Sequence, residues 1–223
     1  MKVNLISYSQ DPEYREETAL DLVAYCARVS NPGNQNNKET SEKLVKYLIK
    51  HKHWSPLEMV SACLEITTTR DIARQILRHR SFSFQEFSQR YADPTKDMNF
   101  VLREARLQDT KNRQNSVDLT MDTPEQRKLA MDWTKAQQRV TLAAKDAYKW
   151  AINNGIAKEQ ARAVLPEGLI ESRLYMNGTL RSWIHFIELR SANGTQKEHQ
   201  QVAVACAEAI AKIFPMATDL VAN

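Results

Sequence analysis

Hydrophobic residues recur at steps of three and four along much of the chain, which is the spacing of one face of an α-helix. The pattern predicts helices over residues 16–29, 40–53, 71–80, 179–190 and 196–214. The residues expected to point inward from the first two are Leu20, Val23, Ala24, Ala27, Leu44, Tyr47 and Leu48. Asn31-Pro32-Gly33 ends the first helix, and Thr40 or Ser41 can cap the second.

The clearest predicted element is a long helix from Thr123 to about Asn154. Thr123 and Gln126 form a capping box, and Pro124 occupies the first helical position. Gly155 supplies the stop. A narrow apolar stripe follows the helix in steps of four and three: Leu129, Trp133, Ala136, Val140, Ala143, Ala147 and Trp150. Such a stripe suits packing against another helix, including one from a partner subunit.

Alternation of apolar and polar positions predicts strands in two places. Val3–Tyr8 is a short candidate, and Val60, Ala62, Leu64 and Ile66 alternate as in a half-buried strand. Helices outnumber strands and no βαβ rhythm is present, so the pattern indicates the α+β class. The sequence has no internal repeat and no flexible linker, and we therefore expect a single domain over residues 1–223.

Composition narrows the function classes. The 223 residues are 42% hydrophobic and 26% charged, with a formal net charge of +4. No run approaches the roughly 20 apolar residues of a membrane span, and no signal peptide opens the chain, so a cytoplasmic protein is expected. Cys26, Cys63 and Cys206 show no CxxC spacing, which argues against a disulfide framework or a zinc site. The mild charge tolerates nucleotide ligands but falls short of the basic stripe typical of DNA binding.

The segment Arg78–Tyr91 carries the most chemistry. It opens with Arg78-His79-Arg80, and such a density of cations favours a nearby anion, because the arginine fork suits phosphate or carboxylate. If the following residues are extended, Glu86, Ser88 and Arg90 alternate and could face one pocket. The alternative is a solvated basic helix end that offsets the C-terminal dipole.

Other catalytic readings of these residue types are weaker. Ser88 has only His79 as a nearby base and no Gly-x-Ser-x-Gly elbow, so a phosphate-binding hydroxyl is favoured over a nucleophile. His51 and His53 lack the cysteines or carboxylates that would complete a coordination set, so no metal site is predicted. Without a GxGxxG or Walker pattern, a nucleotide cofactor must be held by side-chain cations.

Several segments, in order along the chain, resemble the motifs of flavin-dependent thymidylate synthases. The most specific is Arg78-His79-Arg80 followed by seven residues and then Ser88. The others are His53–Glu58, Ala161–Pro166 and Arg181–Arg190, so that the resemblance covers most of the chain. Two features depart from it: Gln85 stands where many members have Asn, and the polar run 108–118 looks like a peripheral insertion.

The resemblance implies a twisted antiparallel sheet flanked by helices, assembled as a homotetramer with sites shared between subunits. It implies an enzyme that transfers the methylene of methylenetetrahydrofolate to dUMP and reduces it to give dTMP, using FAD and NADPH. The residues implied to contact FAD are Ser55, Arg78, His79, Arg80, Glu86, Thr179, Leu180, Arg181 and His185, with His53 close to the flavin. Those implied to contact dUMP are Gln75, Arg78, Glu86, Phe87, Ser88, Gln89, Arg90, Arg162 and Arg190.

Within this scheme Arg190 is the catalytic residue, because its charge would stabilise negative charge that develops on the N3/O2 side of the uracil ring. No cysteine falls in the matching motifs, so none is expected to act in catalysis. Two alternatives stay open. One is a flavoprotein of the same fold that acts on another substrate, and the other is a nucleic-acid binding module that stacks bases on the phenylalanines of the Arg78–Tyr91 segment.

Overall fold

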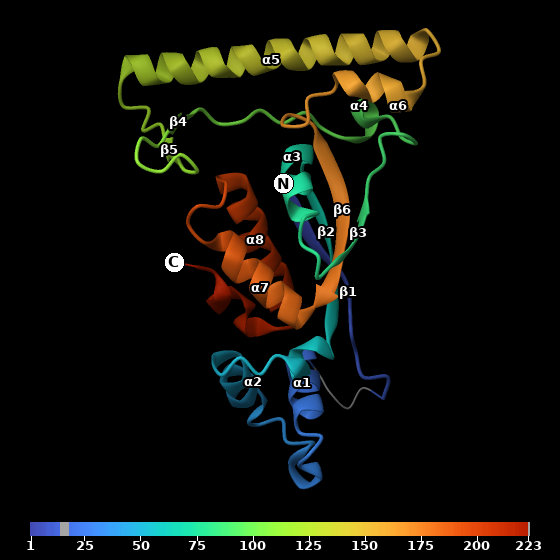
Figure 1. Cartoon of the computed structure of the whole chain (residues 1–223), viewed down its shortest axis with the longest axis vertical. Coiled ribbons are helices and arrows are strands. Elements are labelled where there is room, and N and C mark those ends of the chain that lie inside the picture. The colour runs from blue at the N-terminus through green and yellow to red at the C-terminus, as the bar shows by residue number, and fades with distance from the viewer. Residues whose placement is uncertain (14–17, 223) are drawn as a thin grey trace.

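A four-stranded antiparallel sheet lies at the centre of the computed structural model, which describes residues 1–13 and 18–222 (Figure 1). The strand order is β1-β2-β6-β3. The strands are β1 (Lys2–Tyr8), β2 (Ser61–Thr69), β3 (Ser83–Glu86) and β6 (Glu171–Thr179). The expected antiparallel sheet is confirmed, as are the strands predicted near Val3 and Val60.

Strand β6 is the central strand that the sequence pattern did not predict. It pairs with β2 over all nine of its residues, from Glu171 opposite Thr69 onward, and with β3 along its other edge. Gly178 is needed in this strand because Phe82 presses against it, and a Cβ atom at position 178 would lie 2.4 Å from the phenyl ring. The close approach therefore places a weak strand former near the end of a central strand.

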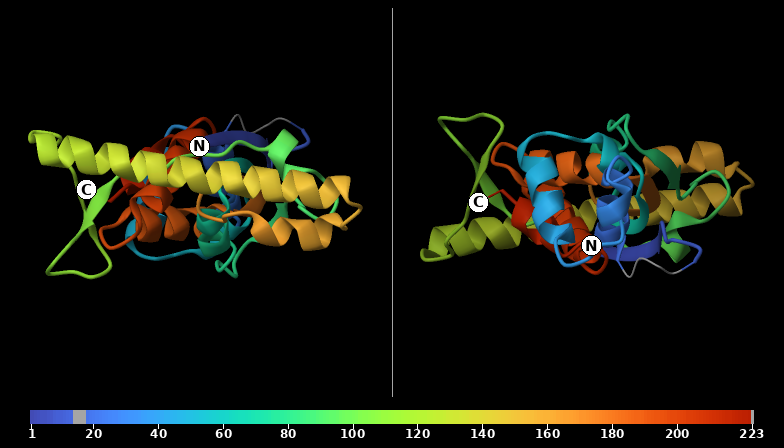
Figure 2. Two further views of the ribbon diagram at one scale, coloured as in Figure 1. Left: turned by 90° about the horizontal axis from the view of Figure 1, so that it is seen from above. Right: turned by 90° about the horizontal axis from the view of Figure 1, so that it is seen from below.

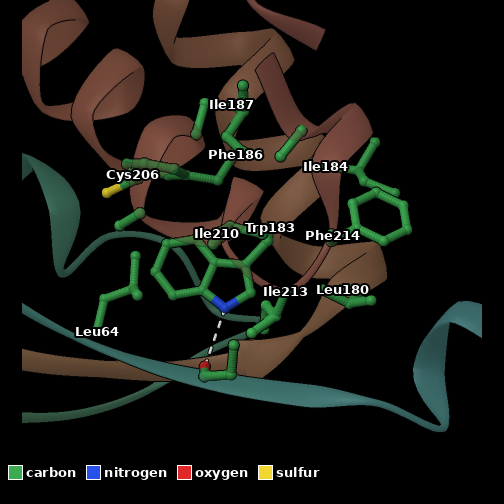
Figure 3. Packing of buried hydrophobic residues seen from close by; sticks show 14 of the residues in the cluster. Leu64, Leu180, Trp183, Ile184, Phe186, Ile187, Cys206, Ile210, Ile213 and Phe214 are labelled. Carbon is green, nitrogen blue, oxygen red and sulfur yellow. Dashed lines mark hydrogen bonds between the residues drawn. The ribbon is translucent and has the colours of Figure 1, made fainter. Parts of the chain in front are cut away.

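Helices α7 (Leu180–Ser191) and α8 (Lys197–Ala211) lie side by side against the sheet. The main core fills the space between them and the strands, where Trp183, Phe186 and Ile210 are about 1% exposed (Figure 3). Trp183 donates from its indole nitrogen to the carbonyl oxygen of Ala62 across 3.0 Å. Each large apolar side chain buried in this way contributes about 1.5–3 kcal/mol, so this layer fixes α7 on the sheet.

Smaller helices close one end of the sheet. They are α1 (Ala19–Ala27), α2 (Ser41–Lys50) and the 3-10 helices η1 (Pro32–Asn34), η2 (Ser55–Glu58) and η4 (Pro215–Leu220). The start predicted at Glu16 lies outside the described residues. Tyr47 was wrongly predicted to point inward: it is 52% exposed because its ring packs on His51 at the surface of α2, with centroids 4.2 Å apart. Val45, fully buried, points inward from α2.

Helix α5 (Pro124–Asn153) confirms the long helix, including the capping box at Thr123. It packs over α4 (Pro94–Asp97), α6 (Lys158–Ala161) and the 3-10 helix η3 (Arg162–Val164) around a second, smaller core. Its N-terminal end projects past the sheet (Figure 2). The apolar stripe is not used inside the chain, since Val140 and Trp150 are 50% and 63% exposed. No helix in the described part of the chain is both long and apolar enough to cross a bilayer.

The polar run 108–118, which looked like a peripheral insertion, forms the larger part of a hairpin. Strand β4 (Arg106–Gln108) pairs with β5 (Ser116–Asp118), and Lys197 of α8 holds the hairpin through an ion pair with Asp118 at 3.0 Å. Arg106 adds an ion pair with Glu198. The hairpin, α5 and the start of α8 line an open pocket of ≈ 860 Å³.

Candidate active site

The arginine-rich segment follows a helix that is shorter than predicted. Helix α3 (Arg70–Ile76) ends before Arg78, so the predicted helix over residues 71–80 was wrong at its C-terminal end. A tight turn follows, in which the amide of His79 donates to the carbonyl of Ile76 across 3.0 Å. The chain leaves the helix because Phe82 must pack edge-on against Trp183, with ring centroids 4.8 Å apart.

His79 and Arg190 meet across this turn. The Nε of Arg190, in the last turn of α7, donates to Nε2 of His79 across 2.8 Å. Burial, and then the nearby charges of Arg190 and Arg78, lower the pKa of His79 to about 4. His79 is therefore neutral near pH 7, carries its proton on Nδ1 and cannot offset the charge of Arg190.

Positive charge in this region is not neutralised within the chain. Among the described residues, no carboxylate lies within ion-pair distance of Arg78, Arg80 or Arg190, whereas Arg103 and Arg181 each pair with acidic side chains. Burial and the charge of Arg78 lower the pKa of the Arg190 guanidinium. Because unpaired, partly buried cations favour an anionic ligand, this turn is a candidate anion site, as predicted from its composition.

Gln75 extends the site from the end of α3. Its Nε2 donates to Oε1 of Gln196 across 2.8 Å, and its Oε1 lies 3.2 Å from Nδ1 of His199 on α8. The structure thus brings Gln75, Arg78, His79 and Arg190 together, and we call these residues the Arg190 group.

A second set of predicted residues gathers at the other end of α7. Thr179 caps this helix by accepting from the amide of Ser182 across 3.3 Å, and Arg181 pairs with Glu58 of η2. His185 lies against the ring of Trp54, with centroids 4.6 Å apart. Exposed Ser55 begins η2, while Leu180 is buried in the core and its side chain is not available. We call Trp54, Ser55, Thr179, Arg181 and His185 the Arg181 group. Arg181 itself lies roughly 14 Å from Arg190 along the helix, at 1.5 Å per residue.

A third set lies beneath α5. The Nε of Arg90 lies 3.4 Å from a carboxylate oxygen of Glu159, and Nε of Arg162 donates to the carbonyl of the same residue across 3.3 Å. The predicted alternation of Glu86, Ser88 and Arg90 was wrong, because β3 ends at Glu86 and the amide of Tyr91 turns back to the carbonyl of Ser88 at 3.2 Å. We call Ser88, Arg90 and Arg162 the Arg162 group.

Phe87 and Gln89 lie beside these residues but are largely enclosed. Phe87 packs against the smaller core and Gln89 is 4% exposed. Their side chains therefore offer less contact surface than the sequence suggested.

The carboxylate of Glu86 is already engaged. It accepts from the hydroxyl of Ser172 across 2.7 Å and lies 3.6 Å from Arg70 and 3.4 Å from Arg74. Neither arginine was predicted as part of the site. Their spacing places both on one face of α3, but nothing in the sequence indicates that this face contacts Glu86. Arg70 is 6% exposed, so these contacts hold β3, β6 and α3 together at the edge of the site.

One chain does not bring every predicted residue into one pocket. The Arg190 and Arg181 groups lie at the two ends of α7, whereas Arg162 lies beneath α5, at the opposite end of β6 from the start of α7 (Figure 1).

Comparison with known proteins decides the family. A family model described as thymidylate synthase complementing protein matches residues 4–216. The chain belongs to this family. A probable flavin-dependent thymidylate synthase from Paramecium bursaria Chlorella virus 1 is 47% identical over 215 residues, which cover 96% of each chain. The flavin-dependent thymidylate synthase of Synechocystis sp. is 50% identical over 195 residues, which cover 87% of this chain and 85% of the relative.

The fold agrees with a solved structure of related chemistry. The UMP/dUMP methylase PolB from Streptomyces cacaoi, bound with 5-Br dUMP, superposes with a TM-score of 0.78 at 25% sequence identity. The superposition covers 98% of this chain and 93% of that one. The resemblance to flavin-dependent thymidylate synthases is therefore confirmed, and with it the prediction of a flavin-dependent methyltransferase.

Two of the three cysteines are poorly suited to nucleophilic chemistry in this member of the flavin-dependent thymidylate synthase family. A nucleophilic cysteine needs a depressed pKa, whereas burial raises the pKa of both Cys63 and Cys206. Neither residue belongs to the groups described above.

Proposed function

We propose that this chain makes dTMP from dUMP, with FAD as cofactor, methylenetetrahydrofolate as carbon donor and NADPH as reductant. The observation that carries the proposal is the pair formed by Arg190 and neutral His79. The hydrogen bond to His79 occupies Nε of Arg190 and leaves the two terminal nitrogens free to donate. O2 of a uracil ring accepts such a bond, and the negative charge that develops on the N3/O2 side during the reaction strengthens its interaction with the planar donor fork of arginine.

The electrostatics give Arg190 its catalytic role. Negative charge must develop on the uracil ring before its carbon can attack, and a fixed cation in a partly buried site stabilises that charge. His79 accepts a hydrogen bond from Arg190 and carries no negative charge. It therefore orients the guanidinium without neutralising its positive charge. Gln75 and Arg78, from the same group, would hold the base and ribose.

The Arg162 group fits a nucleotide phosphate. Arg162 has no carboxylate partner among the described residues, and Arg90 is held near it through Glu159. Together with the Ser88 hydroxyl they offer fork donors and a neutral donor, the usual set for phosphate. We assign this group to the dUMP phosphate.

The Arg181 group fits FAD. Trp54 and His185 offer aromatic surface, Arg181 and Thr179 offer donors, and the chain has no glycine-rich loop to replace them. Arg78 and His79 lie toward the other end of α7, and Arg80 precedes Ser81, whose carbonyl accepts from Ser182 in the first turn of α7. These three residues would hold the remaining phosphates. When bound, the flavin supplies the electron pair that reduces the transferred carbon.

Self-association follows from the exposed stripe on α5, and we propose that its occupant is the same helix of a second chain. An antiparallel pair centred near Val140 would place Trp133 opposite Ala147, with Ala136 and Ala143 close to each other. The large Trp133 ring then meets a small residue, and each contact occurs twice about the axis, as a two-fold interface requires. Assembly into a homotetramer would let one subunit supply the Arg162 group to the Arg190 group of another.

The colour of the protein tests the proposal. The purified chain should be yellow, show flavin absorbance bands and bleach when NADPH is added without oxygen. Arg181→Ala should lower the FAD content, whereas Arg127→Ala, on the exposed start of α5, should not. A colourless protein that refuses added FAD would contradict the proposal.

A further inference from the structure

A chain of hydrogen bonds runs from the carboxylate of Glu198 to the Arg190 group. Nε2 of Gln196 donates to Glu198 across 2.9 Å, and Nε2 of Gln75 donates to Gln196 across 2.8 Å. Oε1 of Gln75 then faces Nδ1 of His199 at 3.2 Å. Arg103 and Arg106 hold the carboxylate from the other side, so its position is fixed.

The chemistry of Glu198 dictates the direction of every bond in this chain. An ionised carboxylate only accepts, so Gln196 must present its NH₂ group and keep its oxygen for the next residue. Gln75 must then donate to that oxygen, which leaves its own oxygen as an acceptor. His199 is therefore the donor, with its proton on Nδ1.

His199 is a neutral donor in a dry environment. Its side chain is 0% exposed and its ring lies 5.8 Å from that of Phe186. Burial, and then the charge of Arg190, lower its pKa to about 3. Packing alone does not need a hydrogen-bond donor, so the geometry at Nδ1 points to a role beyond packing.

We propose that His199 is a positioning residue for nucleotide binding, because its Nδ1–H group fixes the amide of Gln75 in one orientation. The inference rests on the proposed function, in which Gln75 contacts dUMP. The amide of Gln75 is then held at its nitrogen by Gln196 and at its oxygen by His199. Its second N–H group and the second lone pair of its oxygen stay available to the base, each in a fixed position. Without His199 only the bond to Gln196 would hold the amide, so Oε1 of Gln75 would lose its buried partner and the amide could rotate away from the base.

The sharpest test compares His199→Asn with His199→Leu. The two side chains have nearly the same size and shape, but the Asn amide can place an N–H group where Nδ1 of histidine lies, and Leu cannot. Calorimetric titration of the flavin-loaded protein with dUMP should show about three- to tenfold weaker binding for His199→Leu, the loss expected for one hydrogen bond. His199→Asn should recover most of that affinity.

The outcomes separate this inference from the proposed function. If the unmodified protein binds no dUMP, the proposed function fails, and this inference with it. If the unmodified protein binds dUMP and His199→Leu binds it equally well, only the role of His199 is wrong. Equal weakening in both variants would also overturn that role, since it would indicate a packing effect.

A second measurement does not depend on how well these variants fold. Nitrogen NMR of the histidine rings should show His199 protonated on Nδ1 in the unmodified protein. Gln196→Met cuts the link to Glu198 that dictates the direction of these bonds, so the His199 ring should populate both neutral tautomers, while thermal stability and flavin content report on folding. An unchanged Nδ1 tautomer in folded Gln196→Met, or an Nε2 tautomer in the unmodified protein, would overturn the directional chain.

Discussion

Arg190 donates to Nε2 of His79 across 2.8 Å, and this bond joins the last turn of α7 to the turn that follows α3. The histidine accepts without becoming charged, because burial and two neighbouring arginines depress its pKa. The site therefore combines a fixed cation with a neutral orienting partner.

Removal of the Arg190 charge should slow the reaction more than it disturbs the fold. We expect Arg190→Ala to reduce kcat by roughly 10² to 10³, the usual loss for one charge-stabilising donor. Flavin content should stay near normal, and Arg127→Ala serves as a control for an exposed arginine. Full dTMP synthesis by Arg190→Ala would show that the proposed catalytic role is wrong.

Stability should fall between pH 6.5 and 4.5 through the buried histidines. The pKa of His79 is about 4 in the folded chain against 6.5 for the ordinary group, and that of His199 is about 3. As the pH falls through this window, the two histidines bind protons in the unfolded chain but not in the folded chain. The free energy of unfolding therefore decreases. The contribution of Glu198, whose pKa is about 2, is lost only below its ordinary value of 4.5.

Thermal melts at several pH values check this behaviour. His79→Gln keeps an acceptor for Arg190 but cannot be protonated, so its melting temperature should fall less than that of the unmodified protein from pH 6.5 to 4.5. His51→Gln, at the exposed C-terminal end of α2, should behave like the unmodified protein. Identical pH dependence in all three would contradict the buried, neutral state of His79.

Elements with local signals could be predicted from the sequence. Thr123, Pro124, Gln126 and Gly155 mark the ends of α5 by contacts within one turn, and the structure places the helix as predicted. Strand β6 could not be predicted, because its identity depends on pairing with β2 and β3, far away in sequence. Gly178, demanded by the ring of Phe82, further weakens its local pattern.

The residues of the candidate site also differ in how far the sequence could predict them. The cluster of cations in Arg78-His79-Arg80 is visible in the sequence, and the structure brings this turn to Arg190. Two sets of contacts depend on how helix α3 packs. The ion pairs of Arg70 and Arg74 with Glu86 need α3 to lie beside β3, and the hydrogen bond between His199 and Gln75 needs α3 to lie beside α8. No spacing in the sequence records these contacts.

Cysteine should be dispensable for catalysis. The triple variant Cys26→Ala, Cys63→Ser, Cys206→Ala should retain flavin-dependent dTMP formation, with some loss of stability because Cys206 is fully buried. Each single variant is measured for flavin content and turnover. If any one abolished activity in a folded, flavin-loaded protein, the flavin-based mechanism would have to be abandoned.

The α5 interface can be tested by cross-linking. In a cysteine-free background, Val140→Cys should form a disulfide between two chains on mild oxidation, because the proposed antiparallel pair brings the two copies of this position together. Gln138→Cys lies away from the stripe on the same helix and should stay unlinked. Equal cross-linking of both variants, or of neither, would contradict the proposed pairing.

The most direct test of the account is product analysis with the purified protein, FAD, dUMP, NADPH and methylenetetrahydrofolate under anaerobic conditions. A methylene must gain two electrons to become a methyl group, and in this account those electrons come from NADPH through the flavin. We therefore expect dTMP in equal amount to NADPH consumed, with the folate released as tetrahydrofolate. Absence of dTMP, or its formation with an equal amount of dihydrofolate and no NADPH consumed, would contradict the account.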